Sequence, residues 1–450
     1  MKNKIFAIIF IIIFMQIPAN SFCWTGKPPS INPKSKIEYV NINWWDNFSD
    51  PYLKKYIIQS IENNHEAQKA SWQVEEYKQF VKYQFSQELP SLSVGGVYAG
   101  VHWPDSIKNI KNNIFAIPFT ASYEADIFLK NHDKTKSSKK AYLANRFQEK
   151  SVYISLVSDV ATTYINILKF DEQIKIQHEI VINKKENLKR VKLRYKNGVC
   201  NAMAVNNAEK SYKSALSQFD EYKKSRDKSL NQLAVLIGES PQNSLNLERG
   251  RFNDFEYKVE IPSSIPSEVV FSRPDIMAAE ANLEKAKIDI RVARKEFLPS
   301  LKVTGLYSFS NIGGTFGNWD STIAGIVANA AFDLFKGGAK VANLKINMTR
   351  YEQIFQEYRQ VDLNALKEVN DSLIMIRENT KVDKNTSQNL IFQNDNYKRA
   401  QNSFKNGTIS YTDLLLEQET FFNSKQNQVS TKTNRLTDYI TLYKAVGGQL

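Results

Sequence analysis

Apolar residues recur with helical spacing through the longest uninterrupted part of the chain. From Ala339 to Asn406, 68 consecutive residues contain neither glycine nor proline, enough for a helix on the order of 100 Å long. Within this run the apolar positions are separated alternately by three and four residues, at Val341, Leu344, Met348, Tyr351, Phe355 and Tyr358. Such spacing is typical of a seam between two packed helices. We therefore expect a partner helix of equal length.

The partner is predicted beyond a helix-stop signal, Lys405-Asn406-Gly407. Glycine adopts the left-handed conformation that ends many helices, and lysine is favoured near the negative end of the helix dipole. Apolar periodicity resumes from Thr408 to Val446. The pattern predicts a very long helical hairpin with its tip at Gly407.

This hairpin pattern occurs twice, with a constant shift of 209 residues. Leu89-Pro90-Ser91-Leu92 returns as Leu298-Pro299-Ser300-Leu301 (298 − 89), and Tyr195-Lys196-Asn197-Gly198 returns as Phe404-Lys405-Asn406-Gly407 (404 − 195). The same shift relates two pairs with capping-box spacing, Asn63 with Glu66 and Ser272 with Asp275. We infer an internal duplication, with repeat 1 over 44–240 and repeat 2 over 265–450.

After each Leu-Pro-Ser-Leu motif the hydrophobic period changes from helical to alternating. Strands are predicted near 91–103, 114–126, 300–310 and 320–332, the clearest having Leu301, Val303, Gly305, Tyr307 and Phe309 on one face. Each is close to the ten residues that cross a bilayer as a tilted strand. Pro118 is unusual within a strand because it removes one hydrogen-bond donor from the ladder.

Four strands cannot close a barrel, and open strand edges cannot lie in lipid because their unpaired backbone groups would each cost several kcal/mol. If these strands enter a membrane, several copies of the chain must therefore pool them, and three copies would supply twelve. On strand evidence alone, an ordinary soluble hairpin on a helical protein remains an equal alternative.

Composition narrows the class of protein. Of the 450 residues, 42% are hydrophobic and 24% are charged, which is too apolar for a disordered chain and too polar for a bundle of membrane helices. The net charge of +13 could suit an anionic partner such as nucleic acid or a lipid surface. The lysines are spread along the predicted helices, however, which indicates solvated faces rather than one binding patch.

The first residues predict export from the cytoplasm. Lys2 and Lys4 precede an apolar run, and Ala19 and Ser21 have the spacing of a cleavage site, so residues 1–21 are predicted to be a secretory signal peptide. Residues 22–43 are predicted to form an extended N-terminal arm. Cys23 could be acylated, although Phe22 stands where that processing needs a small residue.

No motif for catalysis or for a cofactor emerges. The four histidines, His65, His102, His132 and His178, are scattered, and the chain lacks His-Glu-x-x-His, Gly-x-Ser-x-Gly and phosphate-loop patterns. Only Cys23 and Cys200 could form a disulfide, and none is expected. We expect a protein that is not an enzyme and that holds no cofactor or metal.

An ordered set of motifs resembles the TolC-like outer-membrane efflux channels, particularly the NodT-type outer membrane factors. The set comprises Trp44 to Leu53, Tyr123 to Phe128, Ser272-Arg273-Pro274-Asp275-Ile276, Phe332 to Gly338, Leu442 to Gly448 and both Leu-Pro-Ser-Leu motifs. The resemblance implies that residues 44–450 form one protomer of a homotrimer. Twelve strands would form one barrel in outer-membrane lipid of a Gram-negative bacterium, continued by a helical tube through the periplasm.

The resemblance also implies the function and the partners. Such channels are passive exit ducts of tripartite efflux or secretion systems. Their periplasmic tips dock an adaptor protein and, through it, an inner-membrane transporter. The adaptor opens the closed tip, and nucleic acid has no part in the assembly.

The expected site lies at the two hairpin tips. Asp413 matches the position of a pore-facing aspartate in the family, so three-fold symmetry would form a carboxylate ring that favours cations. Leu416 stands where the family often has a second aspartate, and Ala204 stands at the matching position of the first repeat. A solvated aspartate on a helix face therefore remains open. Helix caps that also dock the adaptor are expected at Lys196, Asn197, Gly198, Lys405, Asn406 and Gly407.

Two rival functions remain at this stage. One is a periplasmic or lipid-anchored coiled-coil scaffold without a pore, which would have the same helical hairpins. The other is a basic helical protein that binds nucleic acid, which conflicts with the signal peptide and would require strongly salt-dependent DNA affinity.

Overall fold

The computed structural model describes residues 30–100, 113–259, 262, 264–312, 319, 321–333 and 335–449. The chain divides into two units, Met1–Asn32 and Pro33–Leu450. The fold described below is that of the second unit. The predicted signal peptide 1–21, the candidate acylation site Cys23 and Trp103, with which the first predicted strand ends, lie outside the described residues.

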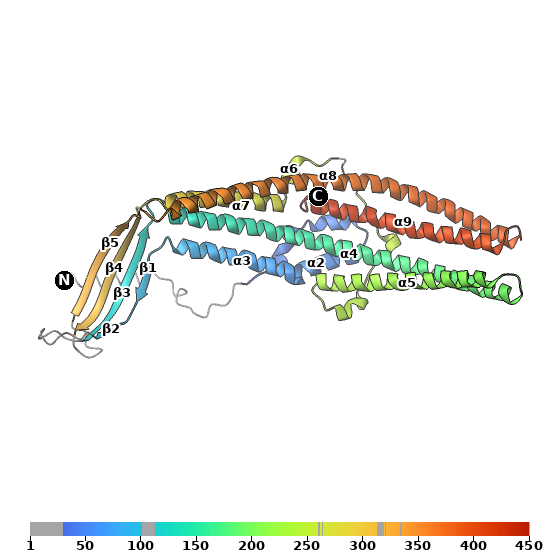
Figure 1. The fold of residues 1–450 in the computed structure, drawn as a ribbon, viewed down its shortest axis with the longest axis horizontal. Coiled ribbons are helices and arrows are strands. Elements are labelled where there is room, and N and C mark those ends of the chain that lie inside the picture. The colour runs from blue at the N-terminus through green and yellow to red at the C-terminus, as the bar shows by residue number, and fades with distance from the viewer. Residues whose placement is uncertain are drawn as a thin grey trace. The chain divides into compact units, whose positions relative to one another are not determined.

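The second unit is mostly helical, with a small antiparallel sheet (Figure 1). Its longer helices are α2 (Pro51–Asn63), α3 (His65–Ser86), α4 (Lys130–Lys196), α5 (Ala202–Leu236), α7 (Pro274–Lys295), α8 (Ala339–Lys405) and α9 (Tyr411–Ala445). Short helical elements are η2 (Pro33–Tyr39), η3 (Ile42–Asn47), η4 (Pro241–Asn246), η5 (Phe252–Asp254) and α6 (Ser267–Phe271). The expected mostly helical fold with a few strands is confirmed.

The helix bounds repeat with the shift of 209 residues that relates the sequence motifs. It relates α3 to α7 (274 − 65), α4 to α8 (339 − 130) and α5 to α9 (411 − 202). The helices of each pair have equal lengths of 22, 67 and 35 residues. Each half therefore builds one short helix, one very long helix and one returning helix.

The expectation of a single partner helix of equal length is wrong. With 35 residues against 67, α9 can accompany only about half of α8, and α7 packs against another part of it. The predicted seam begins in a part of α8 where Val341 and Met348 are 48% and 40% exposed. The chain by itself thus leaves the apolar stripe of α8 incompletely covered.

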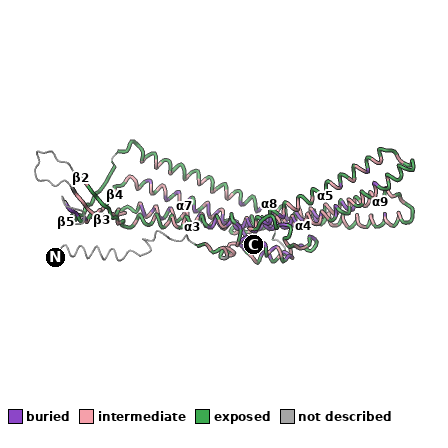
Figure 2. Tube along the Cα trace, turned by 90° about the horizontal axis from the view of Figure 1, so that it is seen from below, coloured by how far each residue is buried: buried purple, intermediate pink, exposed green. Residues whose placement is uncertain are grey.

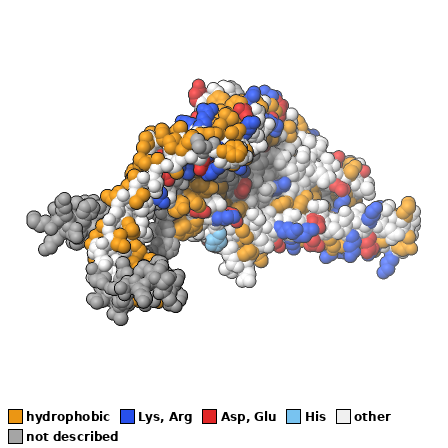
Figure 3. Space-filling model, turned by 60° about the vertical axis from the view of Figure 1, so that its left-hand side comes forward, with side chains coloured by type: hydrophobic (Ala, Val, Ile, Leu, Met, Phe, Trp, Pro, Cys, Tyr) orange, Lys and Arg blue, Asp and Glu red, His pale blue; other side chains and the backbone are white. Residues whose placement is uncertain are grey.

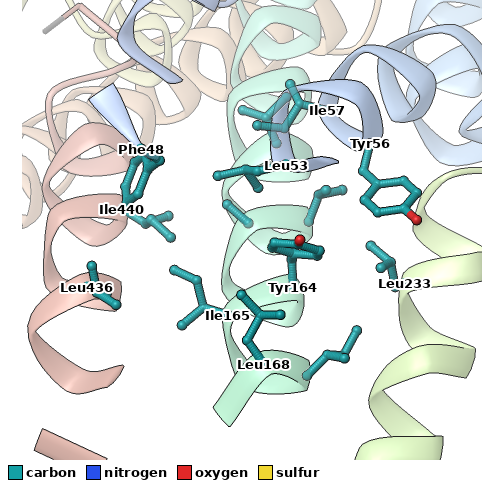
Figure 4. Packing of buried hydrophobic residues seen from close by; sticks show 14 of the residues in the cluster. Phe48, Leu53, Tyr56, Ile57, Tyr164, Ile165, Leu168, Leu233, Leu436 and Ile440 are labelled. Atoms are coloured by element: carbon teal, nitrogen blue, oxygen red, sulfur yellow. The ribbon is translucent and has the colours of Figure 1, made fainter. Parts of the chain in front are cut away.

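The main core forms around the middle of α4, which contacts α2, α3, α5, α7 and α9. Buried residues concentrate there, while the hairpin tips are largely exposed (Figure 2). In Figure 4, Tyr164 and Leu168 of α4 lie between Leu436 of α9 and Leu233 of α5. Among the described helices, α4 alone is long and apolar enough to cross a membrane, but 61% of its apolar window is buried inside the fold. It is therefore the core helix of the bundle.

The segment expected to be an extended arm is partly helical. Within 22–43 the chain forms η2 and begins η3. Two features explain the difference: Pro33 has the fixed φ that suits a helix start, and Lys36 pairs with the fully buried Glu149 carboxylate of α4 at 2.7 Å. Beyond it, the Trp44 ring stacks on Tyr443 at 4.4 Å, which joins the start of the unit to its last helix.

Neither predicted capping box forms, because α3 and α7 each begin one residue later than expected. The N-cap of α3 is Asn64, whose side chain accepts a hydrogen bond from the amide of Ala67 at 3.0 Å. Its counterpart at the start of α7 is Arg273, which carries only donors and cannot cap a helix. Arg273 instead pairs with Asp275 and Glu368 at 2.7 and 2.8 Å.

The sheet contains five described strands rather than four. They are β1 (Ser91–Val94), β2 (Val97–Gly100), β3 (Asn113–Ala125), β4 (Ser300–Ile312) and β5 (Ser321–Ala331), and every pairing is antiparallel. The order is β1-β3-β4-β5, with β2 also pairing with β3.

Pro118 explains why the first predicted strand is divided. The last pair of β1 is Val94 with Phe119, and the first pair of β2 is Val97 with Ala116, so the break lies opposite Pro118. Proline cannot donate to the ladder. Only its carbonyl is used there, accepting a hydrogen bond from the amide of Gly95 at 2.9 Å.

Strand register gives the sheet one apolar and one largely polar face. Phe119 pairs with Tyr307, which pairs with Ala324, and Ala121 pairs with Gly305, which pairs with Ile326. The intervening rows hold Thr120, Ser122, Thr304 and Ser308. No described helix packs over this sheet, and hydrophobic side chains gather along it in Figure 3. Within the described part of the chain, no helix therefore covers the apolar face.

Candidate functional site at the hairpin tips

The two tips are built by the same backbone turn, and they lie at the same end of the helical bundle (Figure 1). α4 ends at Lys196, Asn197 is its C-cap, and Gly198 has φ of +71°. α8 ends at Lys405, Asn406 is its C-cap, and Gly407 has φ of +74°. Because L-residues rarely adopt this conformation, glycine is needed at both turns.

Hydrogen bonds complete each turn in the same way. The amides of Val199 and Gly198 donate to the carbonyls of Arg194 and Tyr195 at 2.9 and 3.0 Å. In the second tip, the amide of Thr408 donates to the carbonyl of Ser403 at 2.9 Å. These are the paired bonds of a Schellman motif. The tip residues singled out from the sequence therefore do serve as helix C-caps.

Asp413 takes part in the start of α9. Its carboxylate accepts hydrogen bonds from the amide and the hydroxyl of Ser410 at 3.1 and 2.8 Å, and its own amide donates to the Ser410 hydroxyl at 3.2 Å. This reciprocal arrangement is a capping box, which is favourable at the positive end of the helix. In the first repeat, Asn201 caps α5 through the amide of Ala204. The carboxylate of Asp413 thus has a local structural role, and it is exposed.

Two side-chain contacts connect the hairpins close to their tips. Lys184 of α4 pairs with Glu419 of α9 at 2.7 Å. Six residues further along α4, the guanidinium of Arg190 lies 3.9 Å from the centre of the Tyr411 ring, a cation–π geometry. Burial raises the pKa of Tyr411, so its ring stays neutral at physiological pH. These contacts hold α9 against α4 close to the two tips.

The arrangement offers binding surfaces rather than reactive groups. Within the part of the chain that the structure describes, no group of three or more His, Cys, Asp and Glu side chains could hold a metal. Leu416, which stands where the family often has an aspartate, is 63% exposed. The site is therefore a pair of exposed helix turns with charged and apolar surroundings.

Sequence analysis missed the four residues that connect α4 to α9. Lys184, Arg190, Tyr411 and Glu419 belong to different hairpins, more than 200 residues apart along the chain for each pair. Helical periodicity places a residue on a face of its own helix but does not say which other helix that face meets. The one available clue was the run of basic residues that closes α4.

Comparison with known proteins decides the family. The model of the outer membrane efflux protein family matches residues 57–239 and 265–448, one match in each repeat. The chain belongs to the outer membrane efflux protein family. The resemblance drawn from the motifs is thereby confirmed.

Relatives within this family are similar over nearly their whole length. The chain is 26% identical to the cation efflux system protein CusC of Escherichia coli O6:H1, covering 91% of this chain and 89% of CusC. It is 25% identical to the probable outer membrane lipoprotein SilC of Salmonella typhimurium, covering 93% and 90%. The crystal structure of the CmeC outer membrane channel of Campylobacter jejuni has the same fold, with a TM-score of 0.82 at 22% identity over 95% and 90%.

Family membership decides the general function and location. The expectation of an outer-membrane exit duct for efflux or secretion is confirmed, and so is the outer-membrane location. This outcome removes the coiled-coil scaffold and the nucleic-acid-binding protein as rival functions.

Proposed function

We propose that three copies of this chain assemble into one passive channel, with no chemistry of its own. The supporting observation is the sheet, which has two open edges among the described strands: there β1 and β2 pair only with β3, and β5 pairs only with β4. Backbone groups on open edges are too costly to leave in lipid. Each chain's outer strands would pair with those of its neighbours and close one barrel, with the apolar face toward lipid.

The channel would continue into the periplasm as a tube of packed helices. The incompletely covered stripe of α8, with Val341 and Met348 exposed, would be buried by the next protomer. Planar bilayer recording of the purified, detergent-solubilised protein tests the proposal. We expect stepwise conductance increments and a native mass of three chains. A water-soluble monomer without conductance would contradict it.

The tips would be the closed end of the duct, opened by an adaptor protein that works with an inner-membrane transporter. Both turns, around Gly198 and Gly407, present backbone and lysine side chains at the end of the bundle. Opening would be a shift between two packings of the second-repeat hairpin, α8 and α9, against its neighbour. The Lys184–Glu419 and Arg190–Tyr411 contacts would have to break during this shift.

Asp413 would contribute to a carboxylate ring at the closed tip, and two substitutions separate this role from helix capping. Asp413→Asn removes the charge but keeps a capping side chain, whereas Asp413→Ala removes both. We expect higher conductance or weaker block by divalent cations in both variants, measured in planar bilayers. A change in Asp413→Ala alone would assign the residue to capping only.

The N-terminus would be processed on export. With simple cleavage, residues 1–21 would be the signal peptide. Acylation of Cys23, which the lipoprotein description of SilC supports, would instead require cleavage between Phe22 and Cys23. Mass spectrometry of the mature N-terminal peptide distinguishes an acylated Cys23 from a simply cleaved chain.

A further inference from the structure

The two tips share a backbone turn but differ in charge. Equivalent windows are residues 184–213 and residues 393–422, related by the 209-residue shift. The first contains nine basic and two acidic residues, a net charge of +7, and the second contains three basic and four acidic residues, a net charge of −1. The expectation that the lysines spread evenly along the helices is therefore wrong for the first tip.

Most of this positive charge is not neutralised within the chain. Three of the nine cations have acidic partners: Lys184 with Glu419, Arg190 with Glu186 and Lys192 with Glu209. The other six are exposed and form no ion pair with any residue that the structure describes: Lys185, Lys189, Arg194, Lys196, Lys210 and Lys213. The helix dipole favours cations within the last turn of a helix, and in α4 only Arg194 and Lys196 lie there.

Apolar side chains also surround the first turn. Leu193, Val199 and Met203 are 61%, 62% and 66% exposed. Their counterparts in the second tip are Asn402, Thr408 and Thr412, which are polar. An apolar centre within a charged rim is the usual anatomy of a protein–protein interface. Neither feature is needed to form the turn, because the second tip forms it without them.

We propose that the first-repeat tip, residues 184–213, is the surface that selects the adaptor, and that its partner is a helical hairpin with acidic residues around an apolar tip. This inference rests on the proposed function, which brings an adaptor to the tips. Acidic side chains would pair with the six free cations, and the partner's apolar residues would cover Leu193, Val199 and Met203. The second tip would provide the contacts that change on opening.

Charge and position argue against other occupants. A second copy of the same tip would bring two strongly positive surfaces together, which is repulsive. Outer-membrane lipid lies around the strands, and the 67 residues of α4 separate them from the tip by on the order of 100 Å. An acidic protein partner fits both the charge and the apolar centre.

Two synthetic helical hairpins, closed by a disulfide, test this inference. They are identical except at the tip, where one carries four glutamates and the other four lysines around the same leucines. Binding to the detergent-solubilised full-length protein is measured by biolayer interferometry. We expect the acidic hairpin to bind and the basic one not to bind. Raising NaCl from about 0.05 to about 0.5 M should weaken binding at least ~10-fold, because salt screens these charges.

Charge reversal provides the decisive variant. Lys189→Glu, Arg194→Glu and Lys210→Glu together should abolish binding of the acidic hairpin and create binding of the basic one. A gain of binding cannot come from a misfolded protein. A second variant, Leu193→Asn with Val199→Thr and Met203→Thr, gives the first tip the polar residues of the second and should weaken binding without changing its salt dependence. The matched control, Lys398→Glu with Arg399→Glu, reverses two exposed cations of the second-tip window that lie outside its turn and should leave affinity unchanged.

Several outcomes would overturn the inference. One is equal affinity for the acidic and the basic hairpin, and another is an equal loss of affinity in the second-tip control. A third is binding of an unstructured glutamate-rich peptide, or of anionic lipid vesicles, that is as tight as binding of the acidic hairpin. The last is salt-dependent association of the channel with itself. Conductance of the same preparation separates this inference from the proposed function. A conducting trimer that ignores the acidic hairpin refutes the inference alone, and hairpin binding without conductance refutes the channel alone.

Discussion

Two glycines with positive φ have a packing role that the tip glycines lack. Gly238, which follows α5, has φ of +76°, and a Cβ atom added there would lie 2.6 Å from the carbonyl oxygen of Asn63. Gly447, its counterpart after α9, has φ of +68°, and an added Cβ would lie 2.9 Å from Cδ of Pro274. In each repeat, the returning helix therefore ends in close contact with the beginning of the repeat.

We predict that Gly238→Ala destabilises the protein more than Gly198→Ala. At Gly198 an added Cβ meets nothing within 4 Å, so only the backbone strain of about 1–2 kcal/mol applies. At Gly238 the same strain is joined by a clash with backbone, which cannot move aside. The thermal midpoint of the helical circular dichroism signal measures both variants. Equal midpoints would show that the close approach relaxes freely.

A buried carboxyl in α9 couples stability to pH. Asp438 is 7% exposed, and its carboxylate accepts a hydrogen bond from the side-chain amide Nδ2 of Asn379 at 2.7 Å. Burial raises the pKa of Asp438 above its ordinary value, and the hydrogen bond only partly opposes this shift. The folded protein therefore binds this proton more tightly than the unfolded chain does. Protonated Asp438 therefore stabilises the folded protein at low pH, and this stabilisation is lost as the pH rises through the raised pKa of Asp438.

Asp438→Asn should accordingly raise the thermal midpoint at neutral pH, since it removes the buried charge while keeping an acceptor for Asn379. The gain should shrink as the pH falls toward 4, where the aspartic acid is itself neutral. Asp220→Asn, on an exposed position of α5, is the matched control and should change little at any pH. A gain that does not depend on pH would exclude burial of charge as its cause.

At the scale of elements, the pairing of α4 with α9 connects the two repeats near their tips. The Lys184–Glu419 ion pair has a lysine side chain that is only 20% exposed, and the Arg190–Tyr411 stack lies beside it. An exposed ion pair contributes little, roughly 0–1 kcal/mol, and a cation–π contact adds about 0.5–2 kcal/mol. Together they are small enough to be broken by a docking partner.

Tyr411→Ala combined with Glu419→Gln should raise the open probability in planar bilayers by up to ~100-fold, the factor that about 3 kcal/mol represents. Glu417→Gln is the matched control, because Glu417 lies in the same turns of α9 without an ion pair among the described residues. An unchanged open probability in the double variant would show that these contacts do not hold the tip closed.

In the whole molecule, the sheet has two faces that differ in polarity. Ile326 belongs to the apolar row with Ala121 and Gly305, whereas the adjacent Val327 belongs to the row with Ser122 and Thr304. Both side chains are exposed in the single chain, at 69% and 55%. Only the assembled channel would place one toward lipid and the other toward the interior.

Ile326→Lys should therefore prevent stable insertion, whereas Val327→Lys should be tolerated. A lysine facing lipid at the middle of the bilayer costs about 2–4 kcal/mol in each chain, so a trimer would bear that cost three times. Recovery of folded trimer from outer-membrane fractions measures the effect. Equal recovery of the two variants would contradict the assignment of the apolar face to lipid.

The local elements follow from the order of residues along the chain. Freedom from glycine and proline set the length of α8, the Lys-Asn-Gly turns set both tips, and alternation of polar and apolar residues set the faces of β4. These properties depend on each residue's own backbone preferences and near neighbours, so they can be read along the chain. Because a constant shift of 209 residues relates the two repeats, each helix or strand predicted in one repeat could be checked against the equivalent residues of the other.

Which faces meet depends on the folded chain as a whole. In the structure α9 covers about half of α8, and Arg273 at the start of α7 pairs with Asp275 and Glu368. Lys184 reaches Glu419, while six nearby cations have no acidic partner among the described residues. The physical reason is that a long helix offers several faces of similar hydrophobicity. Which face is buried, and which charge is paired, follows from the joint packing of all the helices and not from any one of them.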